Sequence, residues 1–215
     1  RRVGDIHEKL GEPDKAESAY RDGVKLLNAL VIIDRGWSTP EEMRGSWAGA
    51  MGQTQFIPST YNQFAVDFDG DRKIDLINNP VDAIGSIANY FKGNGWRAGE
   101  PVVVRARLSG QLYDAATSTE LKTVSTLAML DSQGLAPRDP LNSAATTPAT
   151  GIRLQGMNGG EFWIGFNNFY VITRYNRSIL YAMAAVQLSQ ALEAAQQERD
   201  QAAAAAASSG VSLLP

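Results

Sequence analysis

The sequence predicts an α+β protein in which helices dominate. Apolar side chains recur at helical spacing over residues 3–30, 80–92 and 177–199. Short β-branched or aromatic runs at residues 101–108, 151–154 and 161–166 indicate a small β-containing subdomain. The 215 residues are 44% hydrophobic and 20% charged, which suits a globular chain with one sizeable core or two small ones.

Composition excludes several classes of partner and site. A formal net charge of -3 gives no electrostatic reason to expect nucleic acid or an anionic membrane. The chain has no cysteine, so disulfides and thiolate metal sites are excluded. No apolar run reaches the roughly 18 residues of a membrane span, and residues 1–15 lack the apolar core of a signal peptide. We expect either a removed leader or an internal piece of a longer chain.

Residues 1–30 predict a helical hairpin that turns at residues 11–13. It resembles one repeat of the tetratricopeptide kind, with Leu10, Gly11, Ala16 and Tyr20 at the matching places. No second copy follows, and a single repeat cannot bury its own apolar face. The repeat interpretation therefore stays open.

A second helix start is predicted at residues 38–42, where hydroxyl residues precede Pro40 and two acids face the positive end of the helix dipole. Gly45, Gly49 and Gly52 then punctuate a segment of small residues. Such glycines indicate close backbone approach, either between packed helices or around a ligand.

Residues 67–75, DFDGDRKID, place carboxylates at positions 1, 3, 5 and 9 of an EF-hand-like loop. Crowded carboxylates repel one another without a cation, and their hard oxygens suit Ca²⁺. We expect a structural Ca²⁺ site; the alternative is an acidic surface turn. Arg72 stands where such loops use a left-handed Gly, which costs roughly 1 kcal/mol and adds positive charge, so weakened affinity is expected.

The helix over residues 80–92 is expected to begin at the Asn-Pro-Val-Asp run of residues 79–82. Its predicted buried face consists of Ala83, Ile84, Ile87, Ala88 and Phe91. Beyond it we expect a strand at 101–108, a short helix at 123–134 and a surface loop at 136–150. A hairpin turn at 157–160 joins two further strands.

Residues 169–176 lead into a final helix over 177–199. Its predicted buried set is Ile179, Met183, Val186, Leu188 and Leu192. The predicted organisation has five parts: a hairpin (1–30), a groove-forming helical core with the acidic loop (31–96), a β-containing subdomain (97–168), a returning core helix (169–200) and a disordered tail (201–215).

Residues 45–96 and 161–192 together resemble the lytic murein transglycosylase B family (glycoside hydrolase family 103). The matching stretches include GSWAGAMG, QFIPSTY and, after a long interval, FNNFYVITRYNRS. The resemblance covers roughly residues 29–192 and implies a lysozyme-like helical core. It also implies a periplasmic or cell-envelope location and peptidoglycan glycan strands as the partner.

The resemblance implies a saccharide-binding groove and a calcium loop. The substrate-binding positions of the family fall on Ser46, Gln55, Tyr90, Tyr175, Asn176 and Tyr181. Hydroxyl, amide and aromatic groups suit sugar hydroxyls and ring faces, although buried tyrosines bonded to backbone groups are the alternative. The candidate calcium ligands are Asp67, Asp69, Asp71, the carbonyl of Lys73, and Asp82 in place of the usual glutamate.

The implied reaction cleaves the β-1,4 bond between N-acetylmuramic acid and N-acetylglucosamine and forms a 1,6-anhydro product. One glutamate, protonated in a desolvated pocket, serves as acid and then as base. No glutamate here matches the family motif convincingly. The residues that follow Glu17 lack the motif's glycine, and Glu17 lies too close in sequence to the rest of the match. Glu41 and Glu42 are expected to face the positive end of a helix dipole.

Three functions remain in view from the sequence. The first is a lytic transglycosylase, inactive in this chain if the catalytic glutamate is lacking. The second is a non-catalytic glycan-binding module that keeps the groove residues. The third is a helical-repeat interaction protein that uses the N-terminal hairpin.

Overall fold

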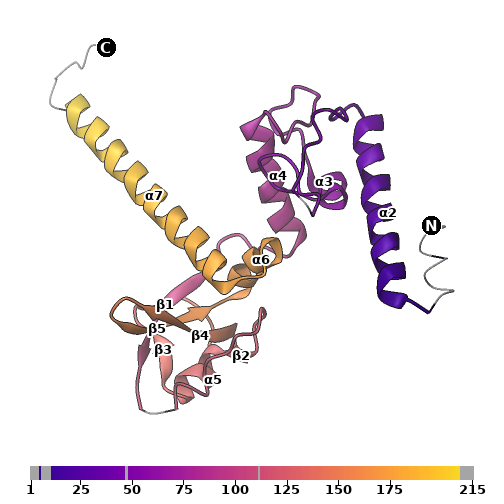
Figure 1. Ribbon diagram of the computed structural model, residues 1–215. Helices are drawn as coiled ribbons and strands as arrows, with labels where there is room; N and C mark the ends of the chain where they lie inside the picture. Colours follow the sequence, from indigo (N-terminus) through magenta and orange to yellow (C-terminus); the bar gives the residue numbers. More distant parts are fainter. Residues whose placement is uncertain (1–4, 6–10, 47, 111, 209–215) are drawn as a thin grey trace. The chain divides into compact units, whose positions relative to one another are not determined.

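The computed structural model describes residues 5, 11–46, 48–110 and 112–208. The chain divides into two compact units, Arg1–Asn94 and Gly95–Pro215 (Figure 1). The first unit is helical and the second combines a sheet with helices, so the predicted α+β class with dominant helices is confirmed. The five-part organisation stays a prediction.

Within its described residues the first unit contains the helices α2 (Pro13–Asp34), α3 (Pro58–Phe64) and α4 (Pro80–Gly93). Each begins with proline, whose restricted φ is already that of a helix and whose missing N–H would have no intrahelical partner. Asn79 caps α4, because its side-chain oxygen accepts the N–H groups of Val81 at 2.9 Å and Asp82 at 3.4 Å. The predicted hairpin helix before Gly11 lies, apart from Asp5, outside the described residues.

The core of the first unit joins helices to loops. Its buried apolar side chains include Ile32, Met51, Phe56, Tyr61, Leu76 and Ala83. The Tyr61 hydroxyl donates to the carbonyl of Ile74 at 3.2 Å, and its ring stacks on Trp37 at a centroid distance of 6.2 Å. Burial raises the pKa of Tyr61 to about 12. This hydroxyl therefore stays protonated and anchors the end of the acidic loop.

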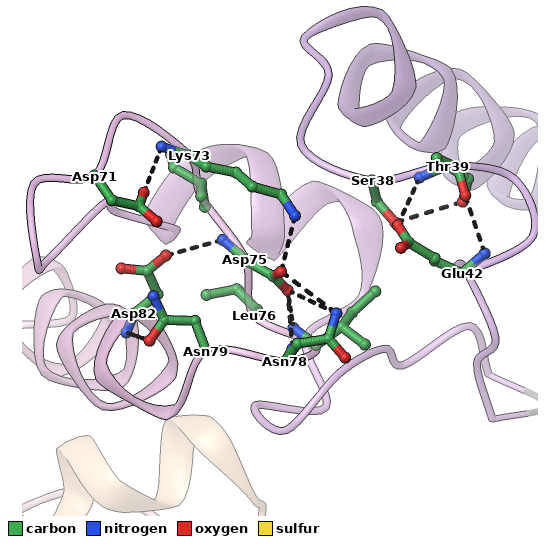
Figure 2. A network of polar contacts seen from close by, with 12 residues as sticks. Ser38, Thr39, Glu42, Asp71, Lys73, Asp75, Leu76, Asn78, Asn79 and Asp82 are labelled. Carbon is green, nitrogen blue, oxygen red and sulfur yellow. Dashed lines mark hydrogen bonds and ion pairs between the residues drawn. The ribbon is translucent and has the colours of Figure 1, made fainter.

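The helix predicted at residues 38–42 is wrong, because the segment forms only one turn. Thr39 N–H donates to the Glu42 carboxylate at 3.2 Å, and Glu42 N–H donates to the Thr39 hydroxyl at 3.3 Å (Figure 2). This reciprocal pair is a capping box. The helix does not continue, since Gly45 is already paired with Met51 in an antiparallel bridge.

The predicted buried face of α4 is also wrong in part. Ile84 is 68% exposed and Ala88 is exposed, whereas Asp82 and Ser86 are buried. The helix is rotated because its polar side chains hold loop backbone, as when the Ser86 hydroxyl accepts Val66 N–H at 3.0 Å. Apolar periodicity cannot reveal a face that is buried through hydrogen bonds.

The second unit contains a five-stranded antiparallel sheet in the order β2-β4-β5-β1-β3. The strands are β1 (Val103–Leu108), β2 (Ser125–Thr126), β3 (Leu135–Pro137), β4 (Pro148–Gly156) and β5 (Gly159–Gly165), with helix α5 (Leu127–Ser132) between β2 and β3. Gly156 pairs with Gly159 across a two-residue turn, which confirms the predicted hairpin. Leu127, Leu130, Leu135 and Ile164 lie in the core between α5 and the sheet.

Two shorter elements of this unit differ from prediction. The helix expected over 123–134 is restricted to α5, because Thr126 caps it by accepting Met129 N–H at 3.3 Å and the residues before it form β2. The expected loop at 136–150 contains most of β3 and the start of β4. Strands of two or three residues are too short to show an apolar period.

The final helix is preceded by another: α6 (Asn167–Tyr175) and α7 (Ile179–Ser208) are separated by a break. The Ser178 hydroxyl accepts Tyr181 N–H at 3.2 Å and so starts α7. Met183 and Val186 are buried as predicted, but Leu188 and Leu192 are 61% and 63% exposed because the later turns of α7 lie beyond the core.

Residues 201–208 are helical instead of disordered, since α7 continues to Ser208, whereas 209–215 lie outside the described residues. Among the described helices, none combines the length and the apolarity needed to cross a bilayer.

Candidate functional site

The acidic loop brings three carboxylates together. One oxygen from each of Asp67, Asp69 and Asp82 lies within 4.8 Å of the others. Asp67 and Asp69 come from the loop, and Asp82 comes from the first turn of α4 (Figure 2 shows Asp82 beside the loop). All are hard oxygen donors, and their convergence fits a cation such as Ca²⁺.

The side chain of Asp82 is hydrogen-bonded to both ends of this loop. Its buried carboxylate accepts Phe68 N–H at 2.8 Å and Asp75 N–H at 2.9 Å, so it joins both ends of the loop to α4. The sequence predicted the position of Asp82 beside the other acids. Its role as hydrogen-bond acceptor for two backbone N–H groups is visible only in the structure.

Asn79 supports Asp69 as well as capping α4. Its side-chain nitrogen donates to Asp69 Oδ2 at 2.8 Å, and this bond, with Asp71 N–H at 3.2 Å on the other oxygen, holds the pKa of Asp69 below its usual value. Asp69 is therefore ionised and oriented at neutral pH. Sequence reasoning identified Asn79 only as a helix start, and an Asn before Pro is the signal that points to the cap.

Asp71 and Asp75 are engaged elsewhere. Asp71 accepts Lys73 N–H at 2.7 Å, and Asp75 accepts Asn78 N–H at 2.8 Å (Figure 2). Burial would raise the pKa of Asp75, but its hydrogen bonds from Asn78 and Lys73 outweigh burial and lower it. The Lys73 ammonium lies 2.9 Å from Asp75, and this hydrogen bond raises the pKa of Lys73.

Arg72 adopts the left-handed conformation that the sequence predicts for its position, with φ of 74°. Its N–H donates to Asp67 Oδ2 at 2.8 Å. The loop thus accepts a non-Gly residue where a Cβ is unfavourable. Its backbone still curls around Asp67, which leaves the three converging carboxylates in place.

The glycine-rich segment packs its backbone against the residues that follow the acidic loop. Gly52 has φ of 64°, and a Cβ there would lie 2.5 Å from the carbonyl oxygen of Leu76. Gln53 adds two hydrogen bonds, from its N–H to Leu76 O at 2.8 Å and from its side chain to Ile77 O at 3.1 Å. The predicted close backbone approach is therefore made against this neighbouring segment.

Ser46 and Gln55 lie exposed on this fixed backbone. The Ser46 hydroxyl oxygen accepts Ala50 N–H at 3.2 Å, while Gln55 has φ of 50° and donates to Gly52 O at 2.9 Å. Beside Ser46 is a hollow of about 420 Å³ lined largely by apolar side chains such as Met43 and Met51. No carboxylate occurs among the described residues that line it.

Tyr90 of α4 is part of an aromatic cluster. Its ring lies 5.6 Å from the ring of Phe56 and 5.0 Å from that of Phe64, measured between centroids. Because Phe56 directly follows Gln55, this packing places Tyr90 near the same segment. The ring is only partly buried.

In the second unit, the end of α6 brings two predicted tyrosines together. The rings of Tyr175 and Tyr181 are nearly parallel, 6.3 Å apart with an interplanar angle of 9°. Asn176 is exposed in the break between α6 and α7. Flat, partly exposed rings beside an amide suit a sugar face and its N-acetyl group.

The glutamates considered from the sequence do not occupy a desolvated pocket. Glu17 is exposed on α2 and paired with Arg21, Glu41 is exposed, and Glu42 belongs to the capping box with Thr39. None has the apolar environment that a general acid requires. The exclusion of Glu17 agrees with this geometry.

The sequence profile of the Transglycosylase SLT domain matches residues 17–190, so the chain belongs to this family. Over 180 residues it is 47% identical to membrane-bound lytic murein transglycosylase B of Escherichia coli strain K12, covering 84% of this chain and 47% of that protein.

The chain is also similar in fold to several solved structures. Soluble lytic transglycosylase SltB1 from Pseudomonas aeruginosa has a TM-score of 0.74 and 40% identity, covering 80% of this chain and 57% of that one. Escherichia coli lytic transglycosylase SLT35 in complex with calcium has a TM-score of 0.70 and 43% identity, covering 85% and 55%. These neighbours confirm the predicted lysozyme-like fold. The chain spans about half the length of its relatives.

Proposed function

We propose that the chain takes part in peptidoglycan cleavage as a lytic transglycosylase domain. Its reaction breaks the β-1,4 bond between N-acetylmuramic acid and N-acetylglucosamine and yields a 1,6-anhydro product. The family relationship is the observation that carries this proposal. The described residues contribute substrate binding and orientation rather than proton transfer, because no suitably enclosed glutamate is found among them.

Glycan binding is assigned to exposed or partly exposed polar and aromatic side chains on fixed backbone. In the first unit these are Ser46, Gln55 and Tyr90, and in the second Tyr175, Asn176 and Tyr181. The close contact of Gly52 with Leu76 and the stacked tyrosines support this assignment, since preorganised groups lose little entropy on binding.

The deciding experiment is incubation of the protein with purified murein sacculi, followed by mass analysis of the released products. Anhydromuropeptides are the expected result. Retention of the protein on sacculi without these products identifies a glycan-binding module instead. Absence of both binding and product overturns the proposal.

We expect Gln55→Ala to weaken binding of a soluble murein glycan by roughly 3- to 10-fold, because an exposed amide that meets the sugar contributes about one hydrogen bond. Isothermal titration measures the affinity, and the melting temperature should change little. Gln53→Ala is the matched control: it removes the bond to Ile77 and should reduce stability while leaving affinity unchanged. The reverse pattern would assign Gln55 to the scaffold.

We also propose that the acidic loop binds structural Ca²⁺. Asp67, Asp69 and Asp82 supply the converging oxygens, and Asp71 and the carbonyl of Lys73 complete the predicted ligand set. The hard donors and the calcium complex of the related SLT35 support this proposal. The ion would neutralise the clustered negative charge and hold the loop against α4.

Calcium should therefore raise the melting temperature. At a concentration about 100-fold above Kd, binding adds roughly 2.7 kcal/mol to the free energy of unfolding, or on the order of 10 °C for a unit of this size. Scanning calorimetry in Ca²⁺ and in excess chelator measures the difference. Identical melting curves in Ca²⁺ and in chelator would contradict the proposed calcium site.

The proposed compartment is the periplasm or cell envelope, because the proposed substrate is found there. Fractionation of cells that express the natural gene, with immunodetection, tests the location. Recovery with cytosolic markers would contradict it.

A further inference from the structure

Three arginines lie on one face of the second unit's sheet. Arg105 and Arg107 are two residues apart in β1 and so project to the same face. Arg138 follows β3, and its N–H donates to Arg105 O at 2.9 Å, which continues the pairing of Arg107 with Ala136. Arg138 therefore stands opposite Arg105, where like charges are unfavourable.

Nearby carboxylates form ion pairs with two of these three arginines. Arg105 is 2.7 Å from Glu161, and Arg138 is 3.1 Å from Asp139. Arg107 makes no ion pair within the described part of the chain and is exposed. It is thus available to an anion from outside.

These side chains line two hollows that share residues 138–141. The larger, of about 600 Å³, includes Arg107 and Arg138 beside the apolar side chains of Leu127, Pro137 and Leu141, with Asp131 at its wall. A carboxylate group and a small apolar group can both be accommodated there.

The smaller hollow, of about 440 Å³, includes Arg105 and Trp163. The Arg105 guanidinium lies 4.7 Å from the centroid of the Trp163 ring. Trp163 Nε1 is buried and has no hydrogen-bond partner among the described residues. Its ring and the cation above it fix one wall of the joined hollows.

We propose that these joined hollows form a subsite for a short peptide that carries a free carboxylate and small apolar side chains. Arginine binds carboxylate through paired N–H donors, and Asp131 and Asp139 can accept an ammonium group of the same peptide. The inference rests on the proposed function, since the peptide stems of peptidoglycan combine carboxylates, amines and alanine methyl groups. The subsite would recognise the stem, separately from the glycan.

The test is isothermal titration of the whole chain with three probes: a synthetic stem tetrapeptide ending in D-alanine, the same peptide with its carboxylates amidated, and murein glycan freed of peptide. We expect the first peptide to bind and amidation to weaken it by about tenfold or more. Arg107→Gln should give a similar loss for the peptide and none for the glycan. Higher salt should weaken peptide binding.

Arg153→Gln is the matched control, because Arg153 is an exposed arginine of the same sheet that is paired with Asp114 outside the hollows. Equal affinity for the amidated peptide, or unchanged affinity in Arg107→Gln, overturns the inference. Glycan binding without peptide binding would contradict the peptide subsite but not the proposed function. Peptide binding without glycan binding would instead leave the subsite standing and contradict the proposed glycan-binding residues.

Discussion

Replacing Asp82 by asparagine is expected to abolish the calcium-dependent rise in melting temperature and to destabilise the metal-free first unit by about 2–3 kcal/mol. The buried carboxylate accepts backbone N–H groups of Phe68 and Asp75. An amide offers one oxygen, so its nitrogen would face a second donor. One N–H of the loop would then have no acceptor, and the loop would lose one of its hydrogen bonds to α4.

Urea unfolding and calorimetry, each with Ca²⁺ and with chelator, measure both effects of Asp82→Asn. Asp131→Asn is the control, because Asp131 is exposed on α5 in the other unit. It should leave stability and the calcium response unchanged. A normal calcium response in Asp82→Asn would show that the ion is held without this carboxylate.

Replacing Gly134 by alanine should destabilise the second unit by about 3 kcal/mol or more. Gly134 has φ of 86°, and a Cβ would lie 1.8 Å from the carbonyl oxygen of Ser109. The same two residues are joined by a bond from Ser109 N–H to Gly134 O at 2.8 Å. Relief of the overlap must therefore separate backbone at the end of β1 from the start of β3.

Gly110→Ala separates the steric overlap from the conformational cost of a side chain at positive φ. Gly110 also has positive φ, 74°, but a Cβ there would meet nothing within 4 Å. Its cost should be about 1 kcal/mol, the conformational part alone. Urea unfolding followed by far-ultraviolet circular dichroism compares the variants. Similar losses would mean that the backbone near Ser109 yields easily and that contact distance is unimportant.

Local signals predicted the elements best. The Asn-Pro run at 79–80 located the start of α4, and the glycines around residues 157–158 located the hairpin of β4 and β5. The face that α4 buries was not predictable from apolar spacing, because Asp82 and Ser86 are buried through bonds to distant backbone. At residues 38–42 the capping signal was correct, but the pairing of Gly45 stopped the helix.

The candidate site was predictable to different degrees. Carboxylate spacing within residues 67–75 is itself the signal of the acidic loop, so its clustering with Asp82 could be expected. No such spacing marks Ser46 and Gln55, since a single hydroxyl or amide side chain shows no sequence pattern. These two residues were predicted from the family resemblance. Arg138 and Trp163 were not anticipated, because only the sheet register brings them beside Arg105.

The backbone contacts of Gly52 and Gln53 with Leu76 join the two halves of the first unit's candidate site. If an ion steadies the acidic loop, it also steadies the backbone that carries Gln55. By thermodynamic reciprocity, glycan that favours the ordered segment must raise the affinity of the loop for the ion by the same factor. Affinity for murein would thus depend on calcium, and the apparent calcium affinity would rise wherever murein is abundant.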